Sequence, residues 1–81
     1  MKVFINVRSG SYSGGMILVA ANTKEEAIKA FREDNRYSWM WDETEEGIED
    51  YYYKEDEWME SFVLTANVDT PQVITENGYS E

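Results

Sequence analysis

The fold is decided by residues 1–32, which read MKVFINVRSGSYSGGMILVAANTKEEAIKAFR. Side chains alternate over the first eight positions: Val3, Ile5 and Val7 point one way and their neighbours the other. A period of two with β-branched residues predicts a strand. Residues 9–15 contain only Ser, Gly and Tyr, which favour a turn, and residues 16–21 are an apolar run of the length of a buried strand. Two strands joined by this loop predict a β-hairpin.

A helix is predicted over residues 24–35. Thr23 and Glu26 are spaced as in a capping box, in which Thr23 accepts a hydrogen bond from the backbone N–H of Glu26. The Glu26 carboxylate in turn accepts from the N–H of Thr23. A narrow apolar stripe would hold this helix on a sheet; it consists of Ala27, Ile28 and Phe31.

The segment 36–60 permits two interpretations. A helical interpretation joins apolar residues into one stripe, consisting of Ile48, Tyr51, Tyr52, Trp58, Met59 and Phe62. Glu55 interrupts that stripe, and the aromatic residues 51–53 have the β propensity of a strand. Periodicity does not separate the two, and we expect a loop-rich segment with a short strand.

The remaining residues predict two further strands. Residues 62–66 alternate, and residues 72–76 form a short β-prone run after the turn residues that end at Pro71. Asn77 and Gly78 predict a turn or a fraying end. The order strand, strand, helix, acidic segment, strand, strand predicts an α+β fold. We expect one domain over residues 1–81, a small antiparallel sheet of about four strands with one helix packed on it.

The composition excludes several function classes. The 81 residues include seven Lys and Arg, seventeen Asp and Glu, no His and no Cys, giving a net charge of −10. Without Cys there is no disulfide, thiolate nucleophile or zinc–thiolate site, and without His the side chain best suited to proton transfer is missing. A charge of −10 opposes binding to a phosphate backbone. We therefore expect a non-enzymatic protein without metal or cofactor that does not bind nucleic acid directly.

The longest apolar run spans six residues, too few to cross a bilayer, and the first residues lack the pattern of a secretion signal. The expected location is therefore the cytoplasm, without membrane association.

Two segments imitate known ligand loops. Gly10, Gly14 and Gly15 lead into a strand, whereas phosphate-binding loops lead into a helix N-terminus. A calcium loop starting at Asp42 would need a carboxylate at its twelfth position, which is Tyr53. The first segment is interpreted as a hairpin loop, and the second leaves only weak, unspecific divalent binding open.

The charge is unevenly distributed along the chain. Residues 1–32 carry five basic and two acidic residues, a net charge of +3. Residues 33–60 carry twelve acidic and two basic residues, a net charge of −10, and residues 61–81 add a further −3. The same 28 residues from 33 to 60 hold seven of the twelve aromatic residues. Aromatic side chains anchor interfaces, and a dense acidic field steers a basic partner into contact.

This acidic aromatic segment is the predicted partner-binding site. Its candidate acidic contacts are Asp42, Glu43, Glu45, Glu46, Glu49, Asp50, Asp56 and Glu57. Its candidate aromatic anchors are Trp41, Tyr52 and Trp58. Clustered carboxylates present charge to a protein as phosphates do. The expected partner is therefore a basic protein surface, such as that of a nucleic-acid-binding protein.

Three parts of the chain resemble small proteins of phages and mobile elements. They are the strand–loop–strand start, the helix opening at residues 21–27 (ANTKEEA) and the ending at residues 71–74 (PQVI). The small size, acidity and absence of Cys and His are similar to those of anti-CRISPR and anti-restriction proteins. This resemblance implies an inhibitor that occludes the nucleic-acid groove of a CRISPR effector or similar defence nuclease.

The alternative hypothesis is an accessory or structural α+β domain, which includes a homo-oligomer. A homo-oligomer predicts an apolar patch at the sheet edge and a doubled mass in solution.

Overall fold

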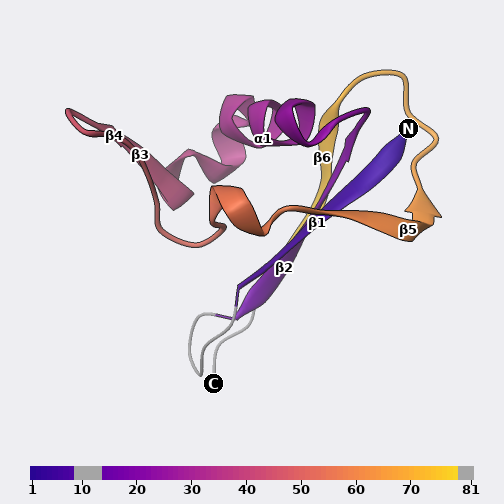
Figure 1. Ribbon diagram of the computed structural model, residues 1–81, viewed down its shortest axis with the longest axis horizontal. Coiled ribbons are helices and arrows are strands. Elements are labelled where there is room, and N and C mark those ends of the chain that lie inside the picture. Colours follow the sequence, from indigo (N-terminus) through magenta and orange to yellow (C-terminus); the bar gives the residue numbers. More distant parts are fainter. Residues whose placement is uncertain (9–13, 79–81) are drawn as a thin grey trace.

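The computed structural model describes residues 1–8 and 14–78, which form an α+β arrangement of two sheets, one α-helix and two short 3-10 helices (Figure 1). The larger sheet is antiparallel, with strand order β5-β1-β2-β6, and the smaller sheet is the hairpin β3–β4. The elements are β1 (Lys2–Arg8), β2 (Gly15–Ala21), α1 (Lys24–Glu33), η1 (Asn35–Met40), β3 (Trp41–Thr44), β4 (Gly47–Asp50), η2 (Glu55–Glu57), β5 (Met59–Thr65) and β6 (Gln72–Gly78). The predicted four-stranded antiparallel sheet with one helix is confirmed.

The central hairpin of the large sheet is the pair β1–β2, in which Phe4 lies opposite Val19 and Ile5 opposite Leu18. The first strand was predicted from its period of two and the second from its short apolar run, and their pairing is confirmed. The predicted Gly-rich loop lies mostly outside the described residues, because residues 9–13 are not among them. The neighbours on each side come from the C-terminal half of the chain, β5 beside β1 and β6 beside β2.

The core lies between the large sheet and α1. The sheet contributes Phe4, Ile17 and Val19, and α1 contributes Ala27 and Phe31. Three residues of the acidic segment complete it, namely Met40, Tyr53 and Trp58. Residues 33–60 therefore contain part of the core, and they are more than a solvated extension.

The N-terminus of α1 is capped by Thr23, whose Oγ1 accepts from the backbone N–H of Glu26 at 3.1 Å. The reciprocal bond differs from the prediction, because the Glu26 carboxylate accepts from the N–H of Asn22 at 3.2 Å rather than from that of Thr23. The helix ends at Glu33, two residues before the predicted end, and Asp34 is its C-cap.

The acidic segment is loop-rich, as predicted, but its strands lie elsewhere. The aromatic residues 51–53 form a bent connection, whereas the residues that pair are 41–44 and 47–50. Strand β5 begins at Met59, three residues before the predicted start. Strand β6 runs to Gly78, so of the two alternatives for Asn77 and Gly78 the turn is wrong, and both residues belong to the end of the strand. No helix in the described part of the chain has the length and apolarity needed to span a bilayer.

Candidate protein-binding site

The β3–β4 hairpin extends away from the large sheet at one end of the molecule (Figure 1). Its turn contains Glu45, Glu46 and Gly47, and Gly47 has a φ of 127°, which glycine adopts without the strain of a side chain. The Thr44 hydroxyl closes this turn by donating to the Gly47 carbonyl at 2.9 Å and accepting from the Glu46 N–H at 3.3 Å. Local polar bonds thus form a tight turn in a sequence with little β propensity.

The hairpin presents five exposed carboxylates and no basic residue. They belong to Asp42, Glu43, Glu45, Glu46 and Glu49. Asp42 lies directly opposite Glu49 in the register. Directly opposed like charges on one face of a hairpin are destabilising. Among the described residues none of these five carboxylates forms an ion pair, so their charges are available to a partner.

The negative field acts on the neighbouring Tyr51. Its pKa is raised above the ordinary value of 10, first by desolvation and then by the charges of Asp42 and Glu49. Only the second of these causes, the two carboxylate charges, would also attract a cation. Asp42 and Glu49 thus place negative charge at the base of the hairpin, beside Tyr51.

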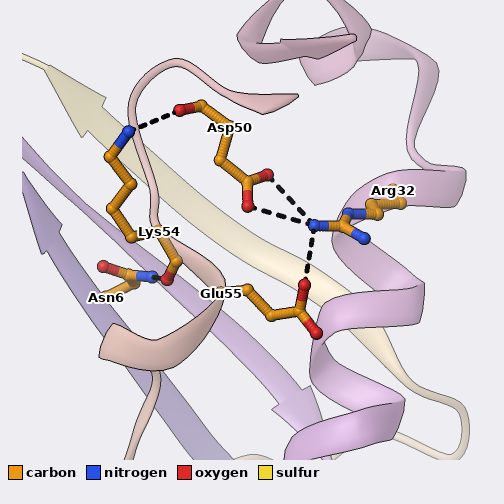
Figure 2. A network of polar contacts seen from close by, with 5 residues as sticks. All are labelled: Asn6, Arg32, Asp50, Lys54 and Glu55. Atoms are coloured by element: carbon orange, nitrogen blue, oxygen red, sulfur yellow. Dashed lines mark hydrogen bonds and ion pairs between the residues drawn. The ribbon is translucent and has the colours of Figure 1, made fainter. Parts of the chain in front are cut away.

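Asp50 anchors the hairpin to α1 and is not a free contact (Figure 2). Both of its carboxylate oxygens accept from Arg32 Nη2, at 3.1 and 3.2 Å, and its side chain is 9% exposed. Arg32 also pairs with Glu55 at 3.5 Å. The Asp50 backbone carbonyl accepts from Lys54 Nζ at 2.7 Å. Asp50 is thus neutralised within the chain, which corrects its predicted role as a partner contact.

A second link fixes the segment that follows the hairpin. The Asn6 side chain is fully buried on the core face of β1, and its Nδ2 donates to the Lys54 carbonyl at 2.8 Å (Figure 2). Further along β1, Arg8 donates to the Tyr53 hydroxyl at 3.2 Å. Arg8 and Tyr53 each also donate to the Glu76 carboxylate, both at 3.0 Å. Burial is the main reason that the pKa of Tyr53 rises to about 12. These bonds fix residues 53 and 54 on the sheet.

Two more predicted acidic contacts, Asp56 and Glu57, lie on η2 and are exposed. Together with Glu55 they continue the acidic surface from the hairpin, since Arg32 bridges Asp50 and Glu55. The structure therefore brings seven predicted acidic residues to the surface: Asp42, Glu43, Glu45, Glu46, Glu49, Asp56 and Glu57.

The three predicted aromatic anchors differ in exposure. Trp58 is 4% exposed and packs against Phe31 with ring centroids 5.8 Å apart, so it belongs to the core. Its predicted role as a partner anchor is corrected, because a partner has no access to its ring. Trp41 is half-buried beside Arg32, whose guanidinium carbon lies 5.8 Å from its ring centroid.

Tyr52 is also half-buried, and it makes an edge contact with Trp39 at 5.2 Å between ring centroids. Trp39 is 58% exposed, and its Nε1 donates to the Arg36 carbonyl at 3.1 Å. Sequence reasoning did not select Trp39, although its place in the Trp-Met-Trp run was a signal: Met40 is buried, and its two neighbours are more exposed. Trp39, Trp41 and Tyr52 are the aromatic part of the site.

An open groove of about 710 Å³ separates the hairpin from the start of α1. Its lining mixes charges and apolar side chains, including Lys24, Ile28, Ile48, Glu49 and Lys54. Within the residues that the structure describes, no three acidic side chains are grouped so as to hold a metal ion. The arrangement offers a charged surface for contact rather than an enclosed reaction site.

Comparisons with family models, with curated proteins and with solved structures find no match for this chain.

Proposed function

We propose that this protein is a non-enzymatic binding module that occupies a basic, nucleic-acid-binding groove of another protein. The proposed partner class is a nucleic-acid-processing protein, with CRISPR effectors and similar defence nucleases as the first candidates. The observation that carries the proposal is the β3–β4 hairpin, which presents five exposed and unpaired carboxylates with two of them directly opposed.

The placement of these charges supports mimicry of nucleic acid. Asp42 and Glu49 are directly opposed and share one face of the hairpin, whereas Glu43 points to the other face because side chains alternate along a strand. The hairpin therefore presents carboxylates on both of its faces as well as at its turn. Lys and Arg side chains that line both walls of a nucleic-acid groove would meet carboxylates on each side.

Repulsion within the hairpin also favours this function. Asp42 and Glu49 face each other, and exchanging either for a neutral residue would relieve the repulsion without removing an ion pair. Basic residues of a partner would lower that repulsion and convert it into binding energy. Trp39 and Tyr52, beside the hairpin, would supply the apolar contact that charges alone do not provide.

The experiment is affinity capture from bacterial lysate, with purified CRISPR effectors and restriction nucleases as defined probes. The wild-type protein is compared with a variant carrying Glu43→Gln, Glu45→Gln and Glu46→Gln. A control variant carries Glu25→Gln, Glu33→Gln and Asp69→Asn, three exposed acidic residues outside the hairpin. Both variants lose three negative charges, so only the position of the loss differs.

We expect the wild type and the control to bind the same nucleic-acid-binding protein and the hairpin variant to lose it. Because electrostatic steering accelerates association by roughly 10-fold or more, the association rate should fall steeply as NaCl is added. Equal binding by all three proteins would refute the role of the hairpin. Recovery of no partner by any of them would favour an accessory or structural domain.

A further inference from the structure

The large sheet has a second face, opposite to the one covered by α1. In antiparallel strands paired residues share a face, and alternate residues along a strand share it too. The register places ten described residues on this second face: Val3, Ile5, Val7, Met16, Leu18, Ala20, Met59, Gln72, Thr75 and Asn77. We refer to these ten residues as the open face.

None of these ten described residues is charged, although 24 of the 81 residues in the chain are. The face toward α1 carries the apolar core and also charged residues, since the same strands place Lys2, Arg8, Glu60 and Glu76 on it. An antiparallel sheet with one covered face ordinarily alternates between apolar residues inside and polar residues outside. Here seven of the ten residues on the second face are apolar as well, and an exposed apolar surface is typical of one that packs against another protein.

The exposure of the open face increases along the central hairpin. Val3 and Ala20, which are paired, are 2% and 0% exposed, whereas Val7 and Met16 at the other end are 51% and 43% exposed. Met59, beside Ile5, is 62% exposed. The available apolar surface is therefore concentrated near the Val7 end of β1 and along β5.

Strand β5 adds to this surface as an edge of the sheet. Its register with β1 shifts between Glu60 and Thr65, and the Ser61 hydroxyl accepts from the backbone N–H groups of Val63 and Leu64 at 3.3 and 3.0 Å. The resulting bulge leaves Phe62 and Val63 96% and 88% exposed. A long apolar edge strand is a template for association with another chain.

The exposed apolar area is large for this chain. Six large apolar residues of the open face and of β5 are 43% to 96% exposed: Val7, Met16, Met59, Phe62, Val63 and Leu64. At roughly 200 Å² for a fully exposed residue of this size, their fractions amount to roughly 770 Å². A standard interface buries about 800 Å² on each partner. One copy therefore exposes close to the area that a stable dimer needs.

We propose that the open face and the adjoining edge strand β5 form the interface of a homodimer. The absence of charge selects a second copy as the occupant, because an uncharged apolar surface matches itself and brings no like charges together. A domain of this size buries only about 60–65% of its unfolded surface, and oligomerisation is a common way to extend such a core.

The arrangement of charge fits this dimer. Helix α1 and the acidic segment lie on the other side of the sheet, as Asp50 pairs with Arg32 of α1 and Asn6 on the core face holds Lys54. Packed layers lie roughly 10 Å apart, so the α1-side layers of two copies, with both sheets between them, would be roughly 30 Å apart. That distance exceeds the Debye length of about 8 Å at physiological salt. Both hairpins would remain accessible in the dimer.

The test is the mass of the wild-type chain in solution by light scattering or sedimentation, at concentrations up to about 100 µM, well above a Kd of about 1 µM. We expect twice the 9.5 kDa of one chain. The variant Val7→Lys/Met59→Lys places charges on exposed positions of the open face and should have the mass of a monomer. Phe62→Ser should weaken the dimer at least 10-fold. The control is Ile48→Lys, the same kind of change at a residue of the hairpin that is 40% exposed, and it should remain dimeric.

Circular dichroism establishes whether each variant is folded, and Phe62→Ser decides the test if the double variant is not. A wild type that is monomeric at every concentration would overturn the proposal. So would dimerisation like that of the wild type, either in the double variant when it is folded or in Phe62→Ser. Added NaCl should preserve or strengthen the dimer, whereas it should weaken binding through the hairpin. The two proposals can therefore fail independently.

Discussion

Replacing Glu49 by Lys should stabilise the fold while weakening the proposed interaction with a basic partner. Glu49 lies directly opposite Asp42, and such pairs have Cβ atoms about 4.5–5.5 Å apart. Two like charges about 6 Å apart in water repel by about 0.7 kcal/mol, and physiological salt reduces this to about 0.3 kcal/mol. Glu49→Gln removes the repulsion, and Glu49→Lys changes it into an attraction of similar size. We therefore expect gains in unfolding free energy of about 0.3 and 0.6 kcal/mol.

The assay is urea denaturation at about 0.15 M and 1 M NaCl, in which an unchanged slope shows that only stability has changed. The control is Glu46→Lys, which makes the same change of charge at the turn, where no residue of the other strand faces it. The gain from Glu49→Lys should exceed that of the control and should largely disappear at 1 M NaCl, where the Debye length is about 3 Å. A gain equal to that of the control, or one independent of salt, would refute the assignment of local repulsion.

Three further predictions concern the fold that positions the hairpin. Trp58→Ala should lower the unfolding free energy by about 3–5 kcal/mol because it leaves a cavity in the core. Trp39→Ala, at an exposed ring, should change it by less than about 1 kcal/mol. Similar losses in the two variants would contradict the different burial of the two rings. Thr23→Ala should reduce stability by about 1 kcal/mol in the same assay, because the N–H of Glu26 loses its acceptor; no loss would contradict the cap. The Tyr53 pKa is about 12 in the folded state against an ordinary 10, so the folded state holds this proton more tightly. The contribution of Tyr53 to stability is therefore complete below pH 10 and falls as the pH rises toward 12. In denaturation curves measured over this pH range, the unfolding free energy of Tyr53→Phe should fall less steeply with pH than that of the wild type. An equally steep fall would show that Tyr53 does not cause the loss of stability.

The central hairpin and the helix were predictable because local signals and tertiary packing agree there. Strand β1 has the period of a strand, β2 is an apolar run of strand length, and Thr23 caps α1 with its own side chain. Which face of the sheet packs against α1 was harder to predict. Val3, Ile5 and Val7 read as one face, but the face that meets α1 carries Phe4 and Asn6, and both faces are apolar enough to be buried.

The acidic segment was predictable in its charge and not in its pairing. Asp, Glu and Gly have low strand propensity, so nothing local predicts the pairing of residues 41–44 with 47–50. The hairpin is held to α1 by a contact between Asp50 and Arg32, which are 18 positions apart. In the sequence Asp50 looks like its acidic neighbours, and only this contact distinguishes an anchoring carboxylate from an exposed one. The burial of Trp58 likewise follows from its packing on Phe31.

The measurement that tests the central claim most directly is displacement of a labelled nucleic acid from the captured partner. We expect the wild-type protein to release the nucleic acid, with an effect that declines as NaCl is added. The variant Glu43→Gln/Glu45→Gln/Glu46→Gln should release little, while the control Glu25→Gln/Glu33→Gln/Asp69→Asn should act like the wild type. Equal displacement by the hairpin variant and the wild type would contradict the claim that the hairpin carboxylates occupy a basic nucleic-acid groove.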